Sequence, residues 1–373
     1  MSDRPAAGET GEETGFIVHS LVQPAGRDAS GSRLALLGRL RSGKSFAAVL
    51  EPYRPGFYLR AGDSGQASSL GLQPQPAART TRDGEPVVRV ELATVQALRQ
   101  AATDFQARGV RTYEADLTPT DAPLIERHIH GSLRIRGSAV PGHHVDLVFM
   151  NPEIEPADWN PQLTILSIDI ETDPRSEEIL AVSLVSSGPW GEPANGVLFN
   201  GPELSDPRIT SYAGERELLA GLVERIRRVD PDIITGWNVI DFDMAVIARR
   251  LARHGVPFAI TRSPEHARFL PSSQDAGGRR QNAAVSCPGR QVIDALRLVR
   301  YGPERFDDRK LGSVAQAVLG ITKTVEAETS SEKIRTLLAL YRDDPAAFCD
   351  YCRTDAELVL RILDATGLMA LTL

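Results

Sequence analysis

The sequence predicts a two-domain protein: an α/β domain in the larger, C-terminal part, and a smaller, mainly β (α+β) domain before it. The first observation is the length, because 373 residues are more than one hydrophobic core usually serves. The second is that apolar runs in residues 16–60 are short and separated by Gly, Pro and Ser, as in antiparallel strands. The third is that strand-like and helix-like segments alternate from residue 163 onward, which indicates an α/β sheet.

Two changes of composition divide the chain into three expected segments. Residues 1–15 are polar and acidic and have no apolar signal core, so we expect a disordered tail there. The segment 151–162 contains three prolines and is therefore the expected domain boundary. We place an N-terminal domain at residues 16–152 and a second domain at residues 153–373.

The N-terminal domain is expected to consist mostly of short strands. Apolar runs follow one another through residues 16–60, and a stretch rich in Gly, Ser, Gln and Pro at 61–78 indicates a loop. Residues 87–109 begin as a strand and continue as an amphipathic helix. Further strands are expected at 111–119, 132–140 and 144–150.

The second domain alternates between strands and helices around a central sheet. Its continuous apolar run at 163–170 is typical of a buried central strand. Other strands are expected at 178–186, 196–200, 230–237 and 290–295, and helices at 214–229, 243–255, 309–319 and 331–367. Residues 261–290, rich in Ser, Gly and Arg, indicate a long loop or a hairpin insertion.

Composition excludes several classes of protein. The chain has no run of about 18 apolar residues, so we expect no membrane span. Three cysteines argue against a disulfide framework and favour the reducing cytoplasm. Residues 1–150 contain 17 Lys and Arg against 16 Asp and Glu, whereas residues 151–373 contain 25 against 33. This acidic balance does not indicate a protein that coats nucleic acid by bulk charge, and it does not exclude an enzyme that gathers carboxylates around metal ions.

The segment GRLRSGKS at residues 38–45 matches the pattern of a phosphate-binding loop. Such a loop must connect a strand to a helix, because the amides at the helix start hold the phosphates. Only six residues separate Ser45 from Pro52, which leaves no room for a helix of useful length. We therefore expect two strands joined by a turn at Ser42–Gly43, with Lys44 in solvent, no ATP binding, and unchanged activity in Lys44→Ala.

The segment SIDIET carries the first pair of candidate catalytic residues, Asp169 and Glu171. Residues i and i+2 of a strand point to the same face, so these two carboxylates lie side by side at the end of a buried strand. Carboxylates this close repel one another unless a cation lies between them, and carboxylate oxygens favour Mg²⁺ or Mn²⁺. Taken alone, the pair also fits a strand end at which one acid caps the following turn.

Two further segments contain acids at suggestive spacings. In GWNVIDFD, Asp243 lies at the start of a helix, where a carboxylate either caps the helix or faces a metal ion. In FCDYCRTDAEL, Tyr351 and Asp355 are four residues apart and share one face of a helix. Each of these segments alone is as well explained by an ordinary structural role.

Together, the three segments form a specific pattern. D-x-E on a strand, N-x-x-x-F-D after a strand and Y-x-x-x-D on a late helix resemble the Exo I, Exo II and Exo III motifs of DEDDy-type 3′–5′ proofreading exonucleases. The sequences GWNVIDFD and YCRTDAEL are similar to the corresponding segments of the family-B DNA polymerases, in particular the bacterial DNA polymerase II branch. The flanking segments TYEADLTP, DPDIITGWN and GRQVIDAL agree, and the resemblance extends over residues 15–373.

The resemblance implies a fold, a site and partners. The fold implied is an RNase H-like exonuclease domain with a mixed sheet, preceded by the N-terminal domain of these polymerases. Two Mg²⁺ or Mn²⁺ ions would be held by four acids: Asp169, Glu171, Asp243 and Asp355. Tyr351 would orient the attacking water, and Asn238 and Phe242 would lie near the substrate. The partners implied are the single-stranded or frayed 3′ end of DNA, a polymerase domain beyond this chain, whose motifs are absent here, and a sliding clamp.

Two other functions remain as alternatives at this point. A P-loop NTPase is suggested by residues 38–45, and residues 163–171 also fit its apolar strand ending in acids. A catalytically silent nucleic-acid-binding module with the same fold is the second alternative. The presence of all four acids and of Tyr351 weighs against a silent module. Assays of ATP hydrolysis and of 3′-end digestion with Mg²⁺ distinguish the three functions.

Overall fold

The computed structural model describes residues 10–25, 31–274, 278, 280–321 and 330–371 of the chain. The chain divides into two compact units, the first ending at Pro161 and the second beginning at Gln162. The division falls inside the proline-rich segment 151–162, but after residue 152, because β9 (Glu153–Pro156) pairs with β7 (Ser132–Pro141) of the first unit.

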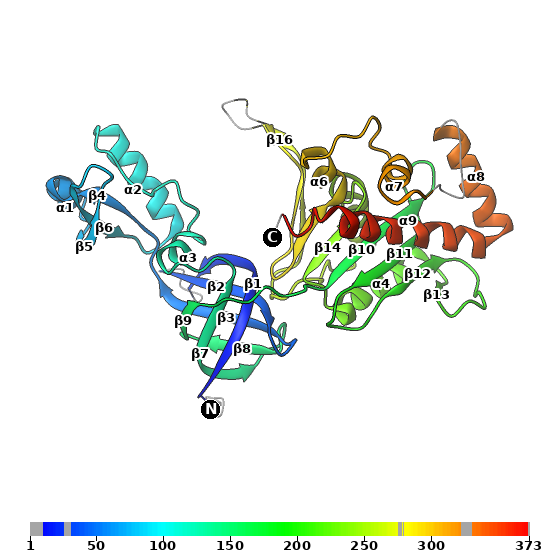
Figure 1. Cartoon of the computed structure of the whole chain (residues 1–373), viewed down its shortest axis with the longest axis horizontal. Helices are drawn as coiled ribbons and strands as arrows, with labels where there is room; N and C mark the ends of the chain where they lie inside the picture. Colours follow the sequence, from blue (N-terminus) through cyan, green and yellow to red (C-terminus); the bar gives the residue numbers. More distant parts are fainter. Residues whose placement is uncertain (1–9, 26–30, 275–277, 279, 322–329, 372–373) are drawn as a thin grey trace. The chain divides into compact units, whose positions relative to one another are not determined.

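The first unit is built on a sheet of six strands in the order β1-β2-β3-β8-β7-β9 (Figure 1). Its remaining strands are β1 (Thr10–Pro24), β2 (Ser32–Leu40), β3 (Ser45–Tyr53) and β8 (Leu147–Met150). An additional pairing of β1 with β7 closes the sheet on itself. Apolar side chains that alternate along these strands fill the interior, among them Leu34, Leu36, Phe46, Leu133 and Phe149.

Part of the expected disordered tail belongs to this sheet. Residues 10–16 pair with residues 132–138 of β7. The first strand therefore begins at residue 10, and not at residue 16 as we expected. The polar sequence of residues 10–15 hides this pairing, because backbone groups form the ladder whatever the side chains are. Residues 1–9 lie outside the described part of the chain.

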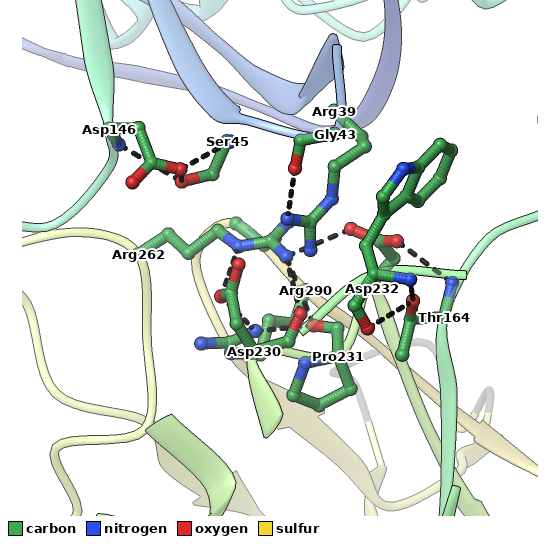
Figure 2. Close-up of polar contacts among 12 residues, drawn as sticks. Arg39, Gly43, Ser45, Asp146, Thr164, Asp230, Pro231, Asp232, Arg262 and Arg290 are labelled. Carbon is green, nitrogen blue, oxygen red and sulfur yellow. Dashed lines mark hydrogen bonds and ion pairs between the residues drawn. The ribbon is translucent and has the colours of Figure 1, made fainter. Parts of the chain in front are cut away.

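The segment GRLRSGKS is a β-hairpin, as predicted. β2 and β3 pair antiparallel, with Arg39 opposite Ser45, and the amide of Gly43 donates to the carbonyl of Leu40 over 2.9 Å. Gly43 has φ 86°, a conformation that glycine adopts without strain. Ser45 is tied to Asp146, whose Oδ2 accepts from its amide and hydroxyl over 2.7 and 2.8 Å (Figure 2). No helix follows the turn, so the segment lacks the geometry of a phosphate-binding loop.

A second, smaller sheet in the first unit has the order β4-β6-β5. It consists of β4 (Gly56–Arg60), β5 (Gln75–Thr80) and β6 (Pro86–Glu91), and helix α2 (Val95–Ala107) packs against it through Phe105, whose ring meets Phe57 edge-on. Short helices η1 (Ala61–Asp63), α1 (Ser64–Ser69) and α3 (Ala122–Glu126) complete it. Strand followed by helix over 87–109 is confirmed.

Two sequence predictions for this part were wrong. Residues 61–78 are not simply a loop, because they contain η1, α1 and the start of β5; the buried Ala67 and its apolar neighbours outweigh the polar composition. Residues 111–119 are not a strand, and only Tyr113 forms a bridge, to Tyr58.

The second unit is built on a mixed six-stranded sheet in the order β13-β12-β11-β10-β14-β19. The strands are β10 (Ile165–Thr172), β11 (Ile179–Ser187), β12 (Asn195–Asn200), β13 (Ile209–Tyr212), β14 (Ile233–Gly236) and β19 (Gln291–Asp294). β10 lies between an antiparallel neighbour, β11, and a parallel one, β14. This central position explains why its sequence is a continuous apolar run.

Helices cover both faces of this sheet (Figure 1). One face packs its apolar side chains against α4 (Glu215–Val229), η2 (Ile240–Met244) and α5 (Ala245–Arg253). The other face carries α8 (Ser330–Asp343) and α9 (Pro345–Thr366). The unit also contains α6 (Ala295–Tyr301) and α7 (Leu311–Leu319). None of the helices in the described residues combines the length and apolar character that a membrane span needs.

The segment 261–290 contains a hairpin, as predicted. β15 (Arg268–Leu270) pairs with β18 (Ala284–Ser286), and β16 (Ser273–Gln274) pairs with β17 (Arg280–Gln281). Residues 275–277 and 279 lie outside the described part.

Two buried arginines anchor the base of this insertion to the sheet (Figure 2). Nε and Nη2 of Arg262 lie 2.9 Å from carboxylate oxygens of Asp230 and Asp232, respectively, and Nη1 of Arg290 lies 2.8 Å from Asp230. The other oxygen of Asp232 accepts from the amide of Thr164 over 3.0 Å. The cluster therefore links the insertion to the starts of β10 and β14. Burial, and the charge of Arg262 beside it, lower the pKa of Arg290 to about 10.

Candidate functional site

Asp169 and Glu171 lie on β10 in the centre of the second unit's sheet. The alternating residues Ile168 and Ile170 belong to the core under α4 and α5. Because side chains of a strand alternate between its two faces, Asp169 and Glu171 point to the opposite face, which α9 covers. Both acids are half-buried.

Helix α9 brings the third acid to this face. The helix begins at Pro345 after Asp344, whose side chain caps it by accepting from the amide of Ala347 over 3.1 Å. Tyr351 and Asp355, one turn apart, are buried, with 8% and 5% exposure. Each of Asp169, Glu171 and Asp355 offers a carboxylate oxygen, and these oxygens all lie within 4.8 Å of one another. The structure thus brings together three of the four predicted acids, from two elements far apart in the sequence.

The fourth predicted acid, Asp243, lies beside this group but not within it. It is 2% exposed, and its Oδ1 accepts from the amide of Ile170 over 3.0 Å, the residue between Asp169 and Glu171. Burial raises the pKa of Asp243 well above its usual value in spite of this hydrogen bond, and the charge of Glu171 adds to the effect.

A π-helical turn carries Asp243. In η2 the amide of Met244 donates to the carbonyl of Val239 over 2.8 Å, five residues back, a pattern often found at functional sites. Asn238 precedes the turn with φ 64°, and its carbonyl accepts from the amide of Phe242 over 3.1 Å. Phe242 is 39% exposed, which is unusual for a phenylalanine in this unit and leaves its ring accessible.

Tyr351 lies close to the acids. Its pKa is raised well above 10, first by burial and then by the negative charges of Asp355 and Glu171. A phenol in this environment keeps its proton over the whole physiological range. Its hydroxyl can therefore donate a hydrogen bond, and it is unsuited to remove a proton from water.

Two residues at this end of the sheet were not among the sequence predictions. Asp294 ends β19 and is buried with 2% exposure, and Arg297 follows it in the first turn of α6. Both contact η2. The available signal was an acid between an apolar strand and a helix, in VIDALRL, which alone indicates only a helix cap.

A model of a known protein family matches residues 110–304 of the chain, and its description is DNA polymerase family B, exonuclease domain. The match covers more than half of the 373 residues. The chain belongs to DNA polymerase family B. It carries the exonuclease domain of this family, and the family predicted from the three motifs is confirmed.

Relatives of this family-B chain include DNA polymerase II of Escherichia coli (strain K12), which is 26% identical over 305 residues, or 80% of this chain and 37% of that protein. The DNA polymerase of Thermococcus litoralis is 26% identical over 217 residues, or 55% of this chain and 12% of that protein. The family-B chain therefore spans little more than a third of the length of its relatives, or less.

The fold is also that of the family. The family-B DNA polymerase from the hyperthermophilic archaeon Pyrobaculum calidifontis matches with a TM-score of 0.71 at 18% identity, over 94% of this chain and 45% of that one. An RNase H-like exonuclease domain with a mixed sheet, after a β-rich N-terminal part, is thus confirmed. The acidic group on β10 and α9 is consistent with metal binding by an exonuclease domain of this kind.

Proposed function

We propose that the chain removes nucleotides from the 3′ end of DNA in the 3′ to 5′ direction, as the proofreading part of a family-B DNA polymerase. The observation that carries the proposal is the convergence of Asp169, Glu171 and Asp355, with carboxylate oxygens within 4.8 Å of one another. These are the acids of the first and third exonuclease motifs. Membership of the chain in family B supports the same activity.

The acidic group fits divalent cations. Three carboxylates this close destabilise one another unless positive charge lies among them, and their hard oxygens favour Mg²⁺ or Mn²⁺ over softer metals. We assign the binding of two such ions to Asp169, Glu171 and Asp355 together with Asp243. When bound, a pair of divalent ions stabilises charge on the attacking and leaving oxygens of a phosphodiester.

The remaining site residues would position the substrates. The buried, protonated hydroxyl of Tyr351 would hold the attacking water through a hydrogen bond. The exposed ring of Phe242 would stack on the terminal base, an interaction that accepts any base, with Asn238 beside it. A mismatched end frays more easily than a paired one and so would reach these residues as a single strand more often.

The first test is the Asp169→Ala variant. Its rate of digestion of a 3′-labelled single strand with Mg²⁺ is expected to be nearly abolished, because the variant removes a carboxylate from the centre of the acidic group. The assay follows release of the labelled nucleotide beside an ATP hydrolysis assay, in which the wild type is expected to be inactive. Undiminished digestion by Asp169→Ala would contradict the proposal.

Helix α9 offers a matched pair of substitutions for the same assay. Asp355→Asn removes a buried charge from the acidic group, whereas Asp350→Asn alters an exposed acid, 56% exposed, on the same helix. We expect near-complete loss of digestion in the first and wild-type digestion in the second. Equal effects of the two would indicate a general disturbance of the helix.

Three wider features belong to the same proposal. A polymerase domain and a sliding clamp are proposed as partners of the intact enzyme, by analogy with the family. DNA as substrate is supported by the names of the relatives. A cytoplasmic location is supported by the three cysteines, all of which are free thiols, as expected in a reducing compartment.

A further inference from the structure

The π-helical turn η2 is held from outside by the carboxylate of Asp294. Oδ2 of Asp294 accepts from the amide of Ile240 over 3.1 Å, at the first residue of the turn. Oδ1 accepts from the amide of Arg297 over 3.2 Å and so caps α6. Capping a helix requires only one oxygen, and the contact of the second oxygen with η2 is additional to that role.

Arg297 holds the next residue of the same turn. Its Nη2 donates to Oδ2 of Asp241 over 2.8 Å, and its Nη1 donates to the carbonyl of Ala283 over 2.8 Å. An exposed ion pair alone contributes little, but here the guanidinium is fixed at both ends and its side chain is only 22% exposed. Asp294, at the end of β19, and Arg297, in the first turn of α6, therefore hold two consecutive residues of η2.

The opposite side of the turn is held by β10. Oδ1 of Asp243 accepts from the amide of Ile170, so η2 is fixed by Asp294 and Arg297 at its start and by β10 at Asp243. Phe242 lies between these two fixed points. Its side chain is 39% exposed, whereas Asp243 and Asp294 are each 2% exposed. A turn that departs from regular helical geometry keeps its conformation only when its surroundings fix it.

We propose that Asp294 and Arg297 are positioning residues of the exonuclease: they hold η2 so that Phe242 faces the terminal nucleotide while Asp243 stays against β10. This inference rests on the function proposed above. It assigns to Asp294 and Arg297 a role in placing the substrate, in addition to any role in stabilising the fold. Loss of the contact made by Asp294 or by Arg297 would let the start of η2 move and would misplace Phe242. Displacements of about 1 Å at such sites cost on the order of 100-fold in rate.

The main test uses Arg297→Gln, because this partly exposed residue can be changed without leaving a buried charge unpaired. Its control is Arg300→Gln, an exposed arginine on the same helix, one turn further on. We expect kcat/KM for single-strand digestion to fall about 10- to 100-fold in Arg297→Gln and to stay at the wild-type value in Arg300→Gln. The melting temperatures of both variants are measured alongside.

A second substrate separates positioning from a loss of folded protein. Single strands that end in a normal nucleotide are compared with strands that end in an abasic one, which offers no base to stack on. Misplacement of Phe242 lowers the ratio of kcat/KM for the normal end to kcat/KM for the abasic end, toward the ratio found in Phe242→Ala. A smaller folded fraction lowers both kcat/KM values equally and leaves this ratio unchanged. A ratio in Arg297→Gln equal to that of the wild type would overturn the inference.

Asp294→Asn is the second variant, since it keeps one acceptor oxygen for the cap of α6 and loses the other. It is expected to show the same lowered ratio as Arg297→Gln. An Asp294→Asn protein that folds and keeps the wild-type ratio also counts against the inference. If the wild type itself digests no DNA, the proposed function fails; if it digests DNA and both variants keep the ratio, only the positioning role fails.

Discussion

Tyr351 combines a buried ring with a hydroxyl that keeps its proton, since burial and the charges of Asp355 and Glu171 raise its pKa. Its ring packs among Phe348, Cys352 and neighbours in the core between α9 and the sheet. The ring therefore has a structural role, and the hydroxyl has the chemical role proposed above. Replacing tyrosine by phenylalanine separates the two roles.

We expect Tyr351→Phe to lower kcat for digestion about 10- to 100-fold while KM changes little, because the variant loses only an orienting hydrogen bond. Steady-state digestion of a labelled single strand measures both parameters. Tyr341→Phe is the control, because Tyr341 belongs to the same core and its hydroxyl donates to the carbonyl of Asn200 over 2.6 Å, away from the acids. An equal loss in the two variants would assign the effect to packing.

At the scale of single residues, the sequence predicts which side chains share a face where the spacing follows the period of a strand or a helix. Asp169 and Glu171 share a strand face and Tyr351 and Asp355 share a helix face because the spacings two and four impose it. The orientation of Asp243 toward the amide of Ile170 depends on a π-helical turn that no spacing announces. Asp294 and Arg297 acquire their contacts with η2 only through tertiary structure, so a single sequence does not reveal them.

At the scale of elements, Gly236 allows β14 to lie close to β10. A methyl group at this position would lie 2.3 Å from the carbonyl oxygen of Ile168, which is far inside van der Waals contact. The residue ends β14, and the chain continues directly into Asn238 and η2. The close approach of the two strands at Gly236 therefore lies directly before Asn238 and η2.

Gly236→Ala is therefore expected to lower both stability and digestion, because the strands must separate to accept the methyl group. Overpacking of this kind typically costs about 1 to 3 kcal/mol, and urea unfolding measures it. Gly255→Ala is a contrasting variant, since Gly255 has open space around it but φ 63°; it should lose stability and keep its activity per folded molecule. Full activity per folded molecule in Gly236→Ala would contradict the argument.

Glu215 joins three elements at one point. It begins α4, is 6% exposed, and accepts from the amide of Ile179 at the start of β11 over 2.9 Å. Nε of Arg250 donates to it over 2.8 Å, and Nε2 of His254 lies 2.7 Å from its other oxygen. Burial alone would raise the pKa of Glu215, but the hydrogen bonds from Arg250 and Ile179 outweigh it and hold the pKa below 4.5.

This lowered pKa predicts a pH dependence of stability. A carboxylate with a lower pKa in the folded than in the unfolded chain stabilises the fold above the unfolded value, and the contribution disappears as the pH falls through the folded value. We expect Glu215→Gln to lose about 2 kcal/mol at pH 7 and to approach the wild type below about pH 4.5. Urea unfolding from pH 7 to pH 3 measures this difference.

The control for this prediction lies on the same helix. Glu224 is 71% exposed, so Glu224→Gln should unfold like the wild type at every pH. A Glu215→Gln difference that persists unchanged at pH 3 would show that lost packing, and not lost charge, destabilises the variant.

Most elements follow from the sequence because their apolar periodicity is strong. The central run of β10 and the amphipathic α4 are examples, with buried side chains where the pattern places them. Where the pattern is weak, tertiary contacts decide: β9 forms because β7 offers an edge, and α1 forms around a single buried alanine, Ala67. Amino-acid composition predicts neither the pairing of β9 with β7 nor the burial of Ala67.

At the scale of the whole molecule, charge and function oppose one another. Residues 151–373 carry more acids than bases, and three of these acids meet where a DNA end is proposed to bind. Without divalent cations, this group repels phosphate. Removing one of its charges should therefore strengthen DNA binding while it removes activity.

We expect Glu171→Gln to bind a labelled single strand several-fold more tightly than the wild type in EDTA at low ionic strength, and to digest it poorly with Mg²⁺. Fluorescence anisotropy measures the affinity, and the difference should shrink at high salt because screening weakens the repulsion. Glu177→Gln, an exposed acid in the loop after β10, is the control. Weaker binding by Glu171→Gln in EDTA would contradict the prediction.

The three cysteines have a practical consequence. Cys287, Cys349 and Cys352 are buried with 2% exposure or less, and all lie in the second unit. Burial raises the pKa of Cys287 to about 11 and that of Cys349 to about 12, and it is the exposed thiolate that attacks an alkylating reagent. Each thiol can therefore react only when its surroundings open. Timed alkylation of the natural chain reports the opening of the exonuclease unit alone, and at Cys349 and Cys352 it reports the release of the helix that carries Asp355, with no label introduced.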